Sequence, residues 1–496
     1  MNLFALVYSG AAMSLNMPDG ELLDRLRQIL GPRGFSDDPA DLDPWLTDWR
    51  GWTRGAAAAL LSPASTAQVA EIVKLAAAAR VAIVPQGGNS SMVAGATPSP
   101  DGGALLLSLR RMRAIRSISD VDNVATAEAG VVLSDLHDAA AAIGRRFPLS
   151  LAAKGTATVG GLISTNAGGT QVLRFGTMRA LLLGIEAVLP DGSLFDGLSA
   201  LRKDNRGYDL RQLLAGAEGT LGVITAASLR LVPAVGQRAV AWVGLSAPRD
   251  ALLLLRRLEA ATGEAVESFE LVPEDALDLV VRHIPGARAP LAGRHRWHVL
   301  IEATAPAGAA DPGEALARGL AEAVEAGLVE DAALAANEAQ AEAMWKLRES
   351  IAEAERIDGQ SVKHDVSVAV SSMPGFIESA GEAVRAAFPG ARVIAFGHLG
   401  DGNVHFNVRP PAGAANAEWM ARHAAAVTAL VHDLTVAAGG SISAEHGIGQ
   451  TKLAEFARLG DPARLAAMRA IKTALDPAGI MNPGKLVPLA QEADAP

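Results

Sequence analysis

Two glycine-rich segments in the first half of the chain restrict its fold more than any other feature. Residues 84–98 read VPQGGNSSMVAGATP, and residues 154–171 read KGTATVGGLISTNAGGTQ. Dense glycines allow backbone N–H groups to approach an anion closely, and the hydroxyl and amide side chains beside them add donors. Neither segment has the G-x-G-x-x-G spacing of a Rossmann fold. We therefore interpret them as phosphate-binding loops of another fold, with two tight turns as the alternative.

The domain organisation follows from the length of the chain and from a change in its pattern. The 496 residues exceed the roughly 100–200 residues of a single domain. Short apolar strands with turn residues between them dominate the first half, whereas later strands alternate with Ala- and Glu-rich helical stretches. We predict an α+β protein with an N-terminal helical segment at 1–57, a first domain at 58–236, an α+β domain with an antiparallel sheet at 237–438, a C-terminal helical segment at 439–489 and a tail at 490–496.

The composition excludes several classes of protein. The chain has no cysteine, which rules out disulfides, thiolate metal sites and iron–sulfur clusters. A net charge of −10 does not provide the basic surface that nucleic acids require, so we expect no nucleic-acid partner. No stretch approaches the ~20 apolar residues of a membrane span. The apolar residues 3–8 lack the preceding basic residues of a secretory signal, so we expect a soluble, cytoplasmic protein whose start is disordered or begins at Met13 or Met17.

Two histidines flank a turn in the stretch FGHLGDGNVHFNV at 396–408. The central Asp401-Gly402 suits a type I′ turn, which would place His398 directly opposite His405 on one face of a hairpin. Their Cβ atoms would then lie ~4.5–5.5 Å apart, with Asn407 on the same face. At that separation both imidazoles can bind one metal ion. The alternative is a histidine pair that stacks on a sheet surface or pairs with carboxylates.

A second stretch, SAEHGIG at 443–449, supplies a carboxylate beside a third histidine. Because Glu445 and His446 are consecutive, their side chains point to opposite sides of an extended segment, and only one of them can face the metal. Two histidines and one carboxylate are a suitable ligand set for a catalytic divalent ion with open positions. Zinc, manganese and iron all suit these ligands, and zinc is our first choice.

Three segments carry a resemblance to a known superfamily. PQGGNSSMVAG, PLSLAAKGTATVGGLISTNAGGTQVLRFGT and AEGTLGVIT, in this order, resemble the FAD-binding domain of the vanillyl-alcohol oxidase/PCMH flavoproteins. Within that superfamily the chain is similar to the D-2-hydroxyacid dehydrogenase branch, which includes D-2-hydroxyglutarate dehydrogenase, D-lactate dehydrogenase and a flavoprotein chain of glycolate oxidase. The resemblance runs from residue 60 to residue 487. It implies a PCMH-type FAD-binding domain of two subdomains at 58–236 and a substrate (cap) domain at 237–438.

The resemblance also assigns residues to FAD. Members with covalently linked flavin carry a histidine in the first loop or a cysteine in the second region, and this chain has neither. We therefore expect non-covalent FAD, which would separate from the polypeptide on acid precipitation. The implied contacts are Pro85, Gln86, Gly87, Gly88, Asn89, Ser90 and Ser91 at the pyrophosphate, Pro148, Gly155, Gly160, Gly161, Thr165, Asn166 and Gly168 along the flavin and its ribityl chain, Gly222, Val223 and Ile224 at the adenosine end, and Asn482 at the isoalloxazine.

For the reaction itself, the resemblance implies a metal site and a base. His398, His405 and Glu445 would be the metal ligands, and His446 the catalytic base. In the mechanism that this arrangement implies, the cation lowers the pKa of the substrate 2-hydroxyl, His446 removes its proton, and the C2 hydride passes to flavin N5.

The same resemblance places cations beside the substrate. Arg348, in a helix predicted at 344–354, and Lys363, in the strand that follows, would face the substrate anion together with Asn407. By composition alone, both cations would be interpreted as surface charges, although Arg suits bidentate carboxylate recognition and Lys offers a point charge. Some glutarate-type members place a hydroxyl one helical turn after the arginine, where this chain has Ala352. That departure leaves the choice of substrate open.

Together these assignments imply the FAD-dependent, metal-assisted oxidation of a D-2-hydroxyacid to the 2-oxoacid. D-2-hydroxyglutarate is the preferred substrate, and D-lactate or glycolate is the alternative. A separate acceptor, which would be an electron-transfer flavoprotein, a cytochrome or a quinone, would reoxidise the flavin, and a homodimer is expected by analogy. Competing classes are a metal-dependent hydrolase, which leaves the glycine loops unexplained, a non-catalytic flavin-binding component of a larger complex, and an oxidase of alcohols or sugars.

Overall fold

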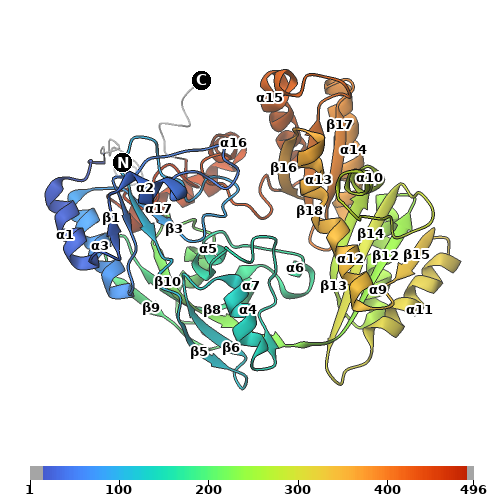
Figure 1. The fold of residues 1–496 in the computed structure, drawn as a ribbon, viewed down its shortest axis with the longest axis horizontal. Helices are drawn as coiled ribbons and strands as arrows, with labels where there is room; N and C mark the ends of the chain where they lie inside the picture. Colours follow the sequence, from blue (N-terminus) through green and yellow to red (C-terminus); the bar gives the residue numbers. More distant parts are fainter. Residues whose placement is uncertain (1–14, 489–496) are drawn as a thin grey trace, which may run out of the picture.

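The computed structural model describes residues 15–488, which fold into two lobes that lie side by side (Figure 1). The chain builds the first lobe up to β11 (Val232–Pro233) and the second lobe from β12 (Val235–Leu245) to α15 (Asn416–Ala437). It then returns to the first lobe, where α16 (Leu453–Leu459) and α17 (Pro462–Leu475) lie. These two crossings bring segments that are distant in sequence to the junction of the lobes.

The first lobe contains a four-stranded sheet in the order β1-β2-β4-β3 and a five-stranded antiparallel sheet in the order β5-β6-β10-β8-β9. In α3, apolar residues recur at helical spacing, and Val69, Ile72 and Val73 are completely buried against the sheets. Strands β7 and β11 form a separate pair. The strands are β1 (Phe35–Ser36), β2 (Ala59–Leu61), β3 (Ile83–Gln86), β4 (Leu105–Ser108), β5 (Ile115–Ser119), β6 (Val124–Glu128), β7 (Arg145–Arg146), β8 (Leu182–Val188), β9 (Leu194–Gly197) and β10 (Val223–Arg230). The helices are α1 (Gly20–Leu30), α2 (Pro39–Leu42), the 3-10 helix η2 (Asp43–Trp45), α3 (Thr66–Ala79), α4 (Leu133–Ala141), α5 (Val159–Ser164), α6 (Val172–Phe175), α7 (Met178–Leu181) and α8 (Leu210–Leu214).

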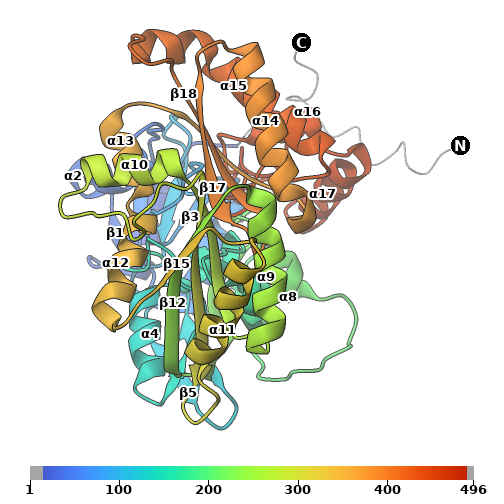
Figure 2. The ribbon, with the colours of Figure 1, turned by 90° about the vertical axis from the view of Figure 1, so that its right-hand side faces the viewer.

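The second lobe is built on a seven-stranded antiparallel sheet in the order β15-β12-β14-β13-β17-β18-β16. Side chains alternate between its faces, so that in β12 Ala241 and Val243 join one core while Val240 and Trp242 join the other. Figure 2 shows α9 and α14 on one side of this sheet and α10, α12 and α13 on the other. The remaining elements are β13 (Val266–Pro273), β14 (Trp297–Pro306), β15 (Asp331–Leu334), β16 (Val362–Ser367), β17 (Arg392–His398), β18 (Asn403–Arg409), α9 (Pro248–Thr262), α10 (Glu274–His283), α11 (Pro312–Glu325), α12 (Glu338–Glu349), α13 (Ile351–Asp358), η3 (Val370–Ser372) and α14 (Met373–Ala387).

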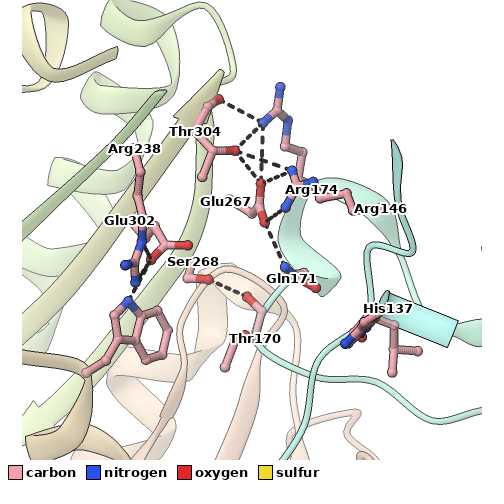
Figure 3. Close-up of polar contacts among 12 residues, drawn as sticks. His137, Arg146, Thr170, Gln171, Arg174, Arg238, Glu267, Ser268, Glu302 and Thr304 are labelled. Carbon is pink, nitrogen blue, oxygen red and sulfur yellow. Dashed lines mark hydrogen bonds and ion pairs between the residues drawn. The ribbon is translucent and has the colours of Figure 1, made fainter. Parts of the chain in front are cut away.

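A buried carboxylate, Glu267 at the start of β13, joins the two lobes (Figure 3). Arg146 of β7 donates to both of its oxygens, at 2.6 and 2.7 Å, and Gln171 donates at 2.9 Å. Thr304 of the neighbouring strand donates at 2.5 Å, and Arg174 approaches at 3.5 Å. Burial alone would raise the pKa of Glu267, but the hydrogen bonds and charge of Arg146 hold it below its usual range. We call these five residues the Glu267 cluster.

The returning C-terminal segment is attached to the strand that precedes the first glycine loop. The N–H of Ile83 donates to the carbonyl of Ile480, and the N–H of Asn482 donates to the carbonyl of Ile83, both at 2.8 Å. The buried Lys472 donates to the carbonyl of Met481 at 2.7 Å and so holds the segment against α17. These bonds place Asn482 beside the first glycine loop, although the two are far apart in the sequence.

The structure confirms the predicted α+β class, the antiparallel sheet of the second lobe and the C-terminal helices. The single helix predicted at 344–354 is wrong, because Ser350, at φ −79° and ψ −4°, ends α12 and begins α13. Serine favours such helix ends because its hydroxyl competes for backbone hydrogen bonds. Within residues 15–488, every helix is too short or too polar to serve as a membrane span. The predictions for the translation start before residue 15 and for the tail at 490–496 lie outside the described residues.

Candidate active site

The histidine hairpin forms from β17 and β18, but its register differs from the predicted one. His398 lies opposite Asn403 instead of His405, so the predicted direct pairing of the two histidines is wrong. A type I′ turn needs positive φ at both central residues. Gly402 has a φ of 83°, whereas Asp401 lacks positive φ and its carboxylate accepts the N–H of Asn403 at 2.9 Å. Because the register shifts by an even number of residues, both imidazoles still share a face, with ring centroids 5.6 Å apart.

The three candidate metal ligands converge despite this difference. The ligand atoms of His398, His405 and Glu445 all lie within 4.8 Å of one another, and Nε2 of His398 is 3.6 Å from Oε1 of Glu445. Two atoms bound to one ion with ~2.1 Å bonds at a tetrahedral angle lie about 3.4 Å apart, so these side chains fit a divalent cation. Burial lowers the pKa of His405 to about 3, which keeps its imidazole in the neutral, metal-binding form.

A carboxylate that no sequence motif indicated orients the first of these ligands. Glu270 accepts a hydrogen bond from Nδ1 of His398 at 2.6 Å, which leaves Nε2 free to face the metal position. The other oxygen of Glu270 accepts Nε of Arg348 at 2.8 Å, and the Arg348 guanidinium stacks over the ring of Phe396 at 4.9 Å. Arg348 is therefore buried and paired within the protein, beside the metal site. The sequence signal for Glu270 is an acidic residue in the buried strand VESFELVP.

Asp365 orients the candidate base. Its Oδ2 accepts the N–H groups of Glu445 and His446, both at 3.0 Å, and lies 3.3 Å from Nδ1 of His446. Burial lowers the pKa of His446 below its usual value although Asp365 opposes the shift, so the imidazole is neutral at pH 7 and its Nε2 remains a proton acceptor. Asp365, Glu445 and His446 also come within 4.8 Å of one another, but the backbone bonds of Asp365 assign it an orienting role.

The other two predicted substrate residues, Lys363 and Asn407, lie opposite each other on β16 and β18. Asn407 donates to Oε2 of the completely buried Glu355 at 2.7 Å, and burial raises the pKa of that carboxyl. Lys363 keeps an exposed side chain, yet its surroundings desolvate the ammonium and lower its pKa.

The two glycine loops pack against each other. A Cβ on Gly88 would lie 1.8 Å from the carbonyl oxygen of Thr156, and one on Gly87 would lie 2.2 Å from Oγ1 of Thr158. Only glycine permits this approach. Thr158 caps the N-terminus of α5, so the first loop lies directly beside a helix N-terminus, where backbone N–H groups favour an anion. The arrangement fits the phosphates of FAD.

An unsatisfied acceptor marks the predicted flavin end. Nδ2 of Asn482 donates to the carbonyls of Gly95 and Glu218, whereas its Oδ1 is buried and has no partner among the described residues. A buried polar atom without a partner is costly, so a donor such as a flavin N–H would suit this position. Gln86 likewise donates to two carbonyls, those of Trp45 and Ala96, and its buried Oε1 also has no partner among the described residues.

The remaining predicted FAD residues fall into three environments. Gly155 is exposed, whereas Pro148, Gly160 and Gly168 are buried. The side chains of Val223 and Ile224 belong to the core of the first lobe, so contact with a ligand there would be made by the backbone. The half-buried residues are Pro85, Gly87, Gly88, Asn89, Ser90, Ser91, Gly161, Thr165 and Asn166, and Gly222 is buried at the start of β10.

A cleft of about 570 Å³ extends from the second glycine loop to Glu445, one of the three candidate metal ligands. Thr165 and Asn166 line it from the first lobe, and Glu445 lines it from the C-terminal loop. Glu218, which also lines it, accepts the N–H groups at 448–449, each at 2.8 Å, and so holds the loop that carries Glu445 against the first lobe. Glu218 lies within the motif AEGTLGVIT, but no sequence pattern predicted its contact with residues 448–449.

Comparisons with known proteins show the family and the fold of the chain. Residues 57–197 match the FAD binding domain family, and residues 236–486 match the family of FAD linked oxidases, C-terminal domain. The mitochondrial D-2-hydroxyglutarate dehydrogenase of Bos taurus is 38% identical over 91% of this chain and 80% of its own length. A putative mitochondrial D-lactate dehydrogenase of Schizosaccharomyces pombe is 34% identical over 95% of this chain and 88% of its own. The structure of p-cresol methylhydroxylase with bound substrate superposes with a TM-score of 0.73 at 16% identity, over 95% of this chain and 97% of the other, so the two share the PCMH fold.

Proposed function

The chain belongs to the family of FAD linked oxidases and is an FAD-dependent oxidoreductase, and from this premise we propose that it oxidises D-2-hydroxyacids to 2-oxoacids with the help of a divalent metal ion. The observation that carries the proposal is the convergence of His398, His405 and Glu445 with the neutral His446 beside them. The likeness to enzymes named for D-2-hydroxyacid substrates supports it.

The side chains of this site have distinct tasks in the proposed reaction. His398, His405 and Glu445 would hold zinc, manganese or iron, and such an ion lowers the pKa of a bound hydroxyl when present. His446 accepts the hydroxyl proton at Nε2, because Asp365 occupies the Nδ1 side. The two glycine loops would hold FAD, which would supply the hydride acceptor for the oxidation at C2. Glu270 keeps the His398 ring in the orientation that exposes Nε2.

D-2-hydroxyglutarate is the substrate that we propose. Lys363 provides a cation for a second carboxylate, and the bovine relative is named for this substrate. D-lactate is the second candidate, because the yeast relative is named for it and Ala352 removes one polar contact. The electron acceptor, a homodimer and a cytoplasmic location remain predictions, and both curated relatives are mitochondrial by name. The hydrolase alternative does not account for membership of a flavoprotein family.

The test is flavin reduction in the purified, FAD-loaded enzyme under anaerobic conditions. We expect D-2-hydroxyglutarate to bleach the flavin absorbance, D-lactate to do so at least about tenfold less efficiently, and the L-enantiomers to have no effect. The His446→Asn variant should retain its flavin but reduce it about 10²- to 10⁴-fold more slowly, which is the usual contribution of a general base. A wild-type flavin that neither D-acid reduces would refute the proposal.

A further inference from the structure

A short loop of the N-terminal segment contacts the first glycine loop. The loop Thr47–Arg54 is closed by a β-bridge between its end residues. Inside it, the buried carboxylate of Asp48 accepts the N–H groups of Trp52 at 2.8 Å and Thr53 at 2.6 Å. Asn89 of the first glycine loop donates to the carbonyl of Thr47 at 2.9 Å. The loop is therefore held by internal hydrogen bonds and is attached to the predicted FAD-binding loop.

The tip of this loop presents an arginine without a bonded partner. The guanidinium of Arg50 stacks on the ring of Trp52 at 4.6 Å, and its Nε is buried with no hydrogen-bond partner among the described residues. Asp48 and Asp365 act on it only through space, and burial lowers its pKa. A guanidinium has five N–H donors in a planar fork, and burying them unpaired is unfavourable. The side chain is therefore prepared for a planar anion such as a carboxylate.

The charge of Arg50 acts on three groups beside the candidate site. Its charge lowers the pKa of Lys363, of His446 and of Lys452, which belong to the second lobe and to the C-terminal loop. Charge effects of this kind fade over roughly 10 Å in solution, so Arg50 lies close to Lys363 and to the candidate base. Arg50 precedes Lys363 by more than 300 residues in the sequence.

The other cations around the site already have partners within the protein. Arg348 is bound to Glu270, and Arg409 is bound to Asp358. Lys452 donates to the carbonyl of Ile442 at 2.9 Å. Two cations differ from these: among the described residues, the side chains of Arg50 and Lys363 form no hydrogen bond with a carboxylate, and Glu355 acts on Lys363 only through space. Two such cations that face one site favour a ligand with a second negative group.

We propose that Arg50 binds the distal carboxylate of the substrate together with Lys363 and thereby selects D-2-hydroxydicarboxylic acids over monocarboxylic ones. This inference rests on the proposed function and names its substrate class. Arg50, which belongs to the N-terminal segment, would supply the polar contact that Ala352 cannot make. Arg50 is a specificity residue here, because it meets the end of the substrate that does not react.

The test compares two substrates that differ only at the distal end. D-2-hydroxyglutarate and D-2-hydroxypentanoate have the same number of carbons, but the second ends in a methyl group. In Arg50→Gln, kcat/KM for D-2-hydroxyglutarate should fall about 10- to 100-fold, mainly through KM, because one charge-assisted hydrogen-bond pair is lost. The value for D-2-hydroxypentanoate should fall far less. Arg50→Lys should recover part of the loss.

Arg54→Gln is the matched control, because Arg54 lies in the same loop but is exposed and paired with Asp43. It should leave both values unchanged. Binding of glutarate, followed by the flavin difference spectrum, gives a readout without turnover and should weaken in Arg50→Gln but not in Arg54→Gln. Equal losses for both substrates, or an unchanged glutarate affinity, would overturn the assignment of Arg50. A wild-type enzyme that neither D-acid reduces would instead refute the proposed function.

Discussion

Glu267 and Glu445 are both carboxylates at the junction of the two lobes, yet their surroundings are opposite. Glu267 is completely buried and accepts hydrogen bonds from Arg146, Gln171 and Thr304 (Figure 3). Those from Arg146 and Thr304 lower its pKa against the effect of burial. No N–H or O–H of the described residues donates to the Glu445 carboxylate, and burial raises its pKa to about 7. The first group has its partners within the protein. The second lacks them, which is the expected state of a group whose partner binds later.

The largest expected effect is the loss of turnover in a Glu445 variant. Glu445→Gln removes a candidate metal ligand, so metal content should be lost and kcat should fall by about 10³-fold or more, since the ion supplies several kcal/mol of stabilisation. The melting temperature should barely change, because no hydrogen bond to the carboxylate is broken. Elemental analysis, steady-state kinetics and thermal melting of the same preparations check this. Normal metal content together with normal turnover would contradict the assignment.

The converse variant, Glu267→Gln, should lower the free energy of unfolding and leave turnover almost unchanged. Removing one partner of a buried ion pair leaves Arg146 unpaired, and such changes cost about 3–5 kcal/mol. Urea unfolding at pH 7 measures this loss, while kcat of the folded protein should stay within a few-fold of the wild type. Glu322→Gln on the exposed surface of α11 is the control and should change the free energy of unfolding by under about 0.5 kcal/mol. A loss for Glu267→Gln no larger than that of the control would remove the distinction between the two regions.

A pH series sharpens the comparison further. The pKa of Glu267 is lower in the folded protein than its unfolded value of 4.5. Its contribution to stability is therefore fully present above pH 4.5 and declines as the pH falls toward the folded pKa. The gap in unfolding free energy between wild type and Glu267→Gln should narrow between pH 7 and pH 4. A gap of constant size at both pH values would show that the charge of Glu267 is not what stabilises the lobe junction.

The smallest effect is expected at a neutral contact of the same junction. Oγ of the buried Ser268 donates to the carbonyl of Thr170 at 2.8 Å, across the two lobes. Ser268→Ala should cost about 1 kcal/mol, the usual net contribution of one hydrogen bond between neutral groups. The same unfolding measurement detects it. A loss as large as that of Glu267→Gln would mean that packing, and not ion pairing, joins the lobes.

Local patterns and the resemblance predicted much of this molecule, and non-local contacts account for what they missed. The apolar spacing of Val69, Ile72 and Val73 is a property of one helix, so the sequence shows it directly. The hairpin turn also has a non-local contact, because Gly400 packs against Leu173 of the first lobe, where a Cβ would lie 2.8 Å from a Leu173 methyl carbon.

The residues of the candidate site also fall into two groups, those that local motifs indicate and those that only non-local contacts explain. Motifs identified His398 and Glu445, because their neighbours in sequence carry the resemblance. Glu270 and Asp365 orient those residues from strands β13 and β16, and each pairing joins residues about 80 or more positions apart. Such contacts depend on how the sheet is assembled, which no local pattern records.

The most direct test of the central claim, that the unsatisfied Glu445 site serves a divalent ion in substrate oxidation, is anaerobic flavin reduction before and after chelation. FAD-loaded enzyme would be dialysed against EDTA, freed of the chelator, and mixed with D-2-hydroxyglutarate in a stopped-flow spectrometer. We predict that the flavin stays bound, that its reduction slows by about 100-fold or more, and that added zinc or manganese restores the rate. Full-rate flavin reduction in the demonstrably metal-free enzyme would contradict the account.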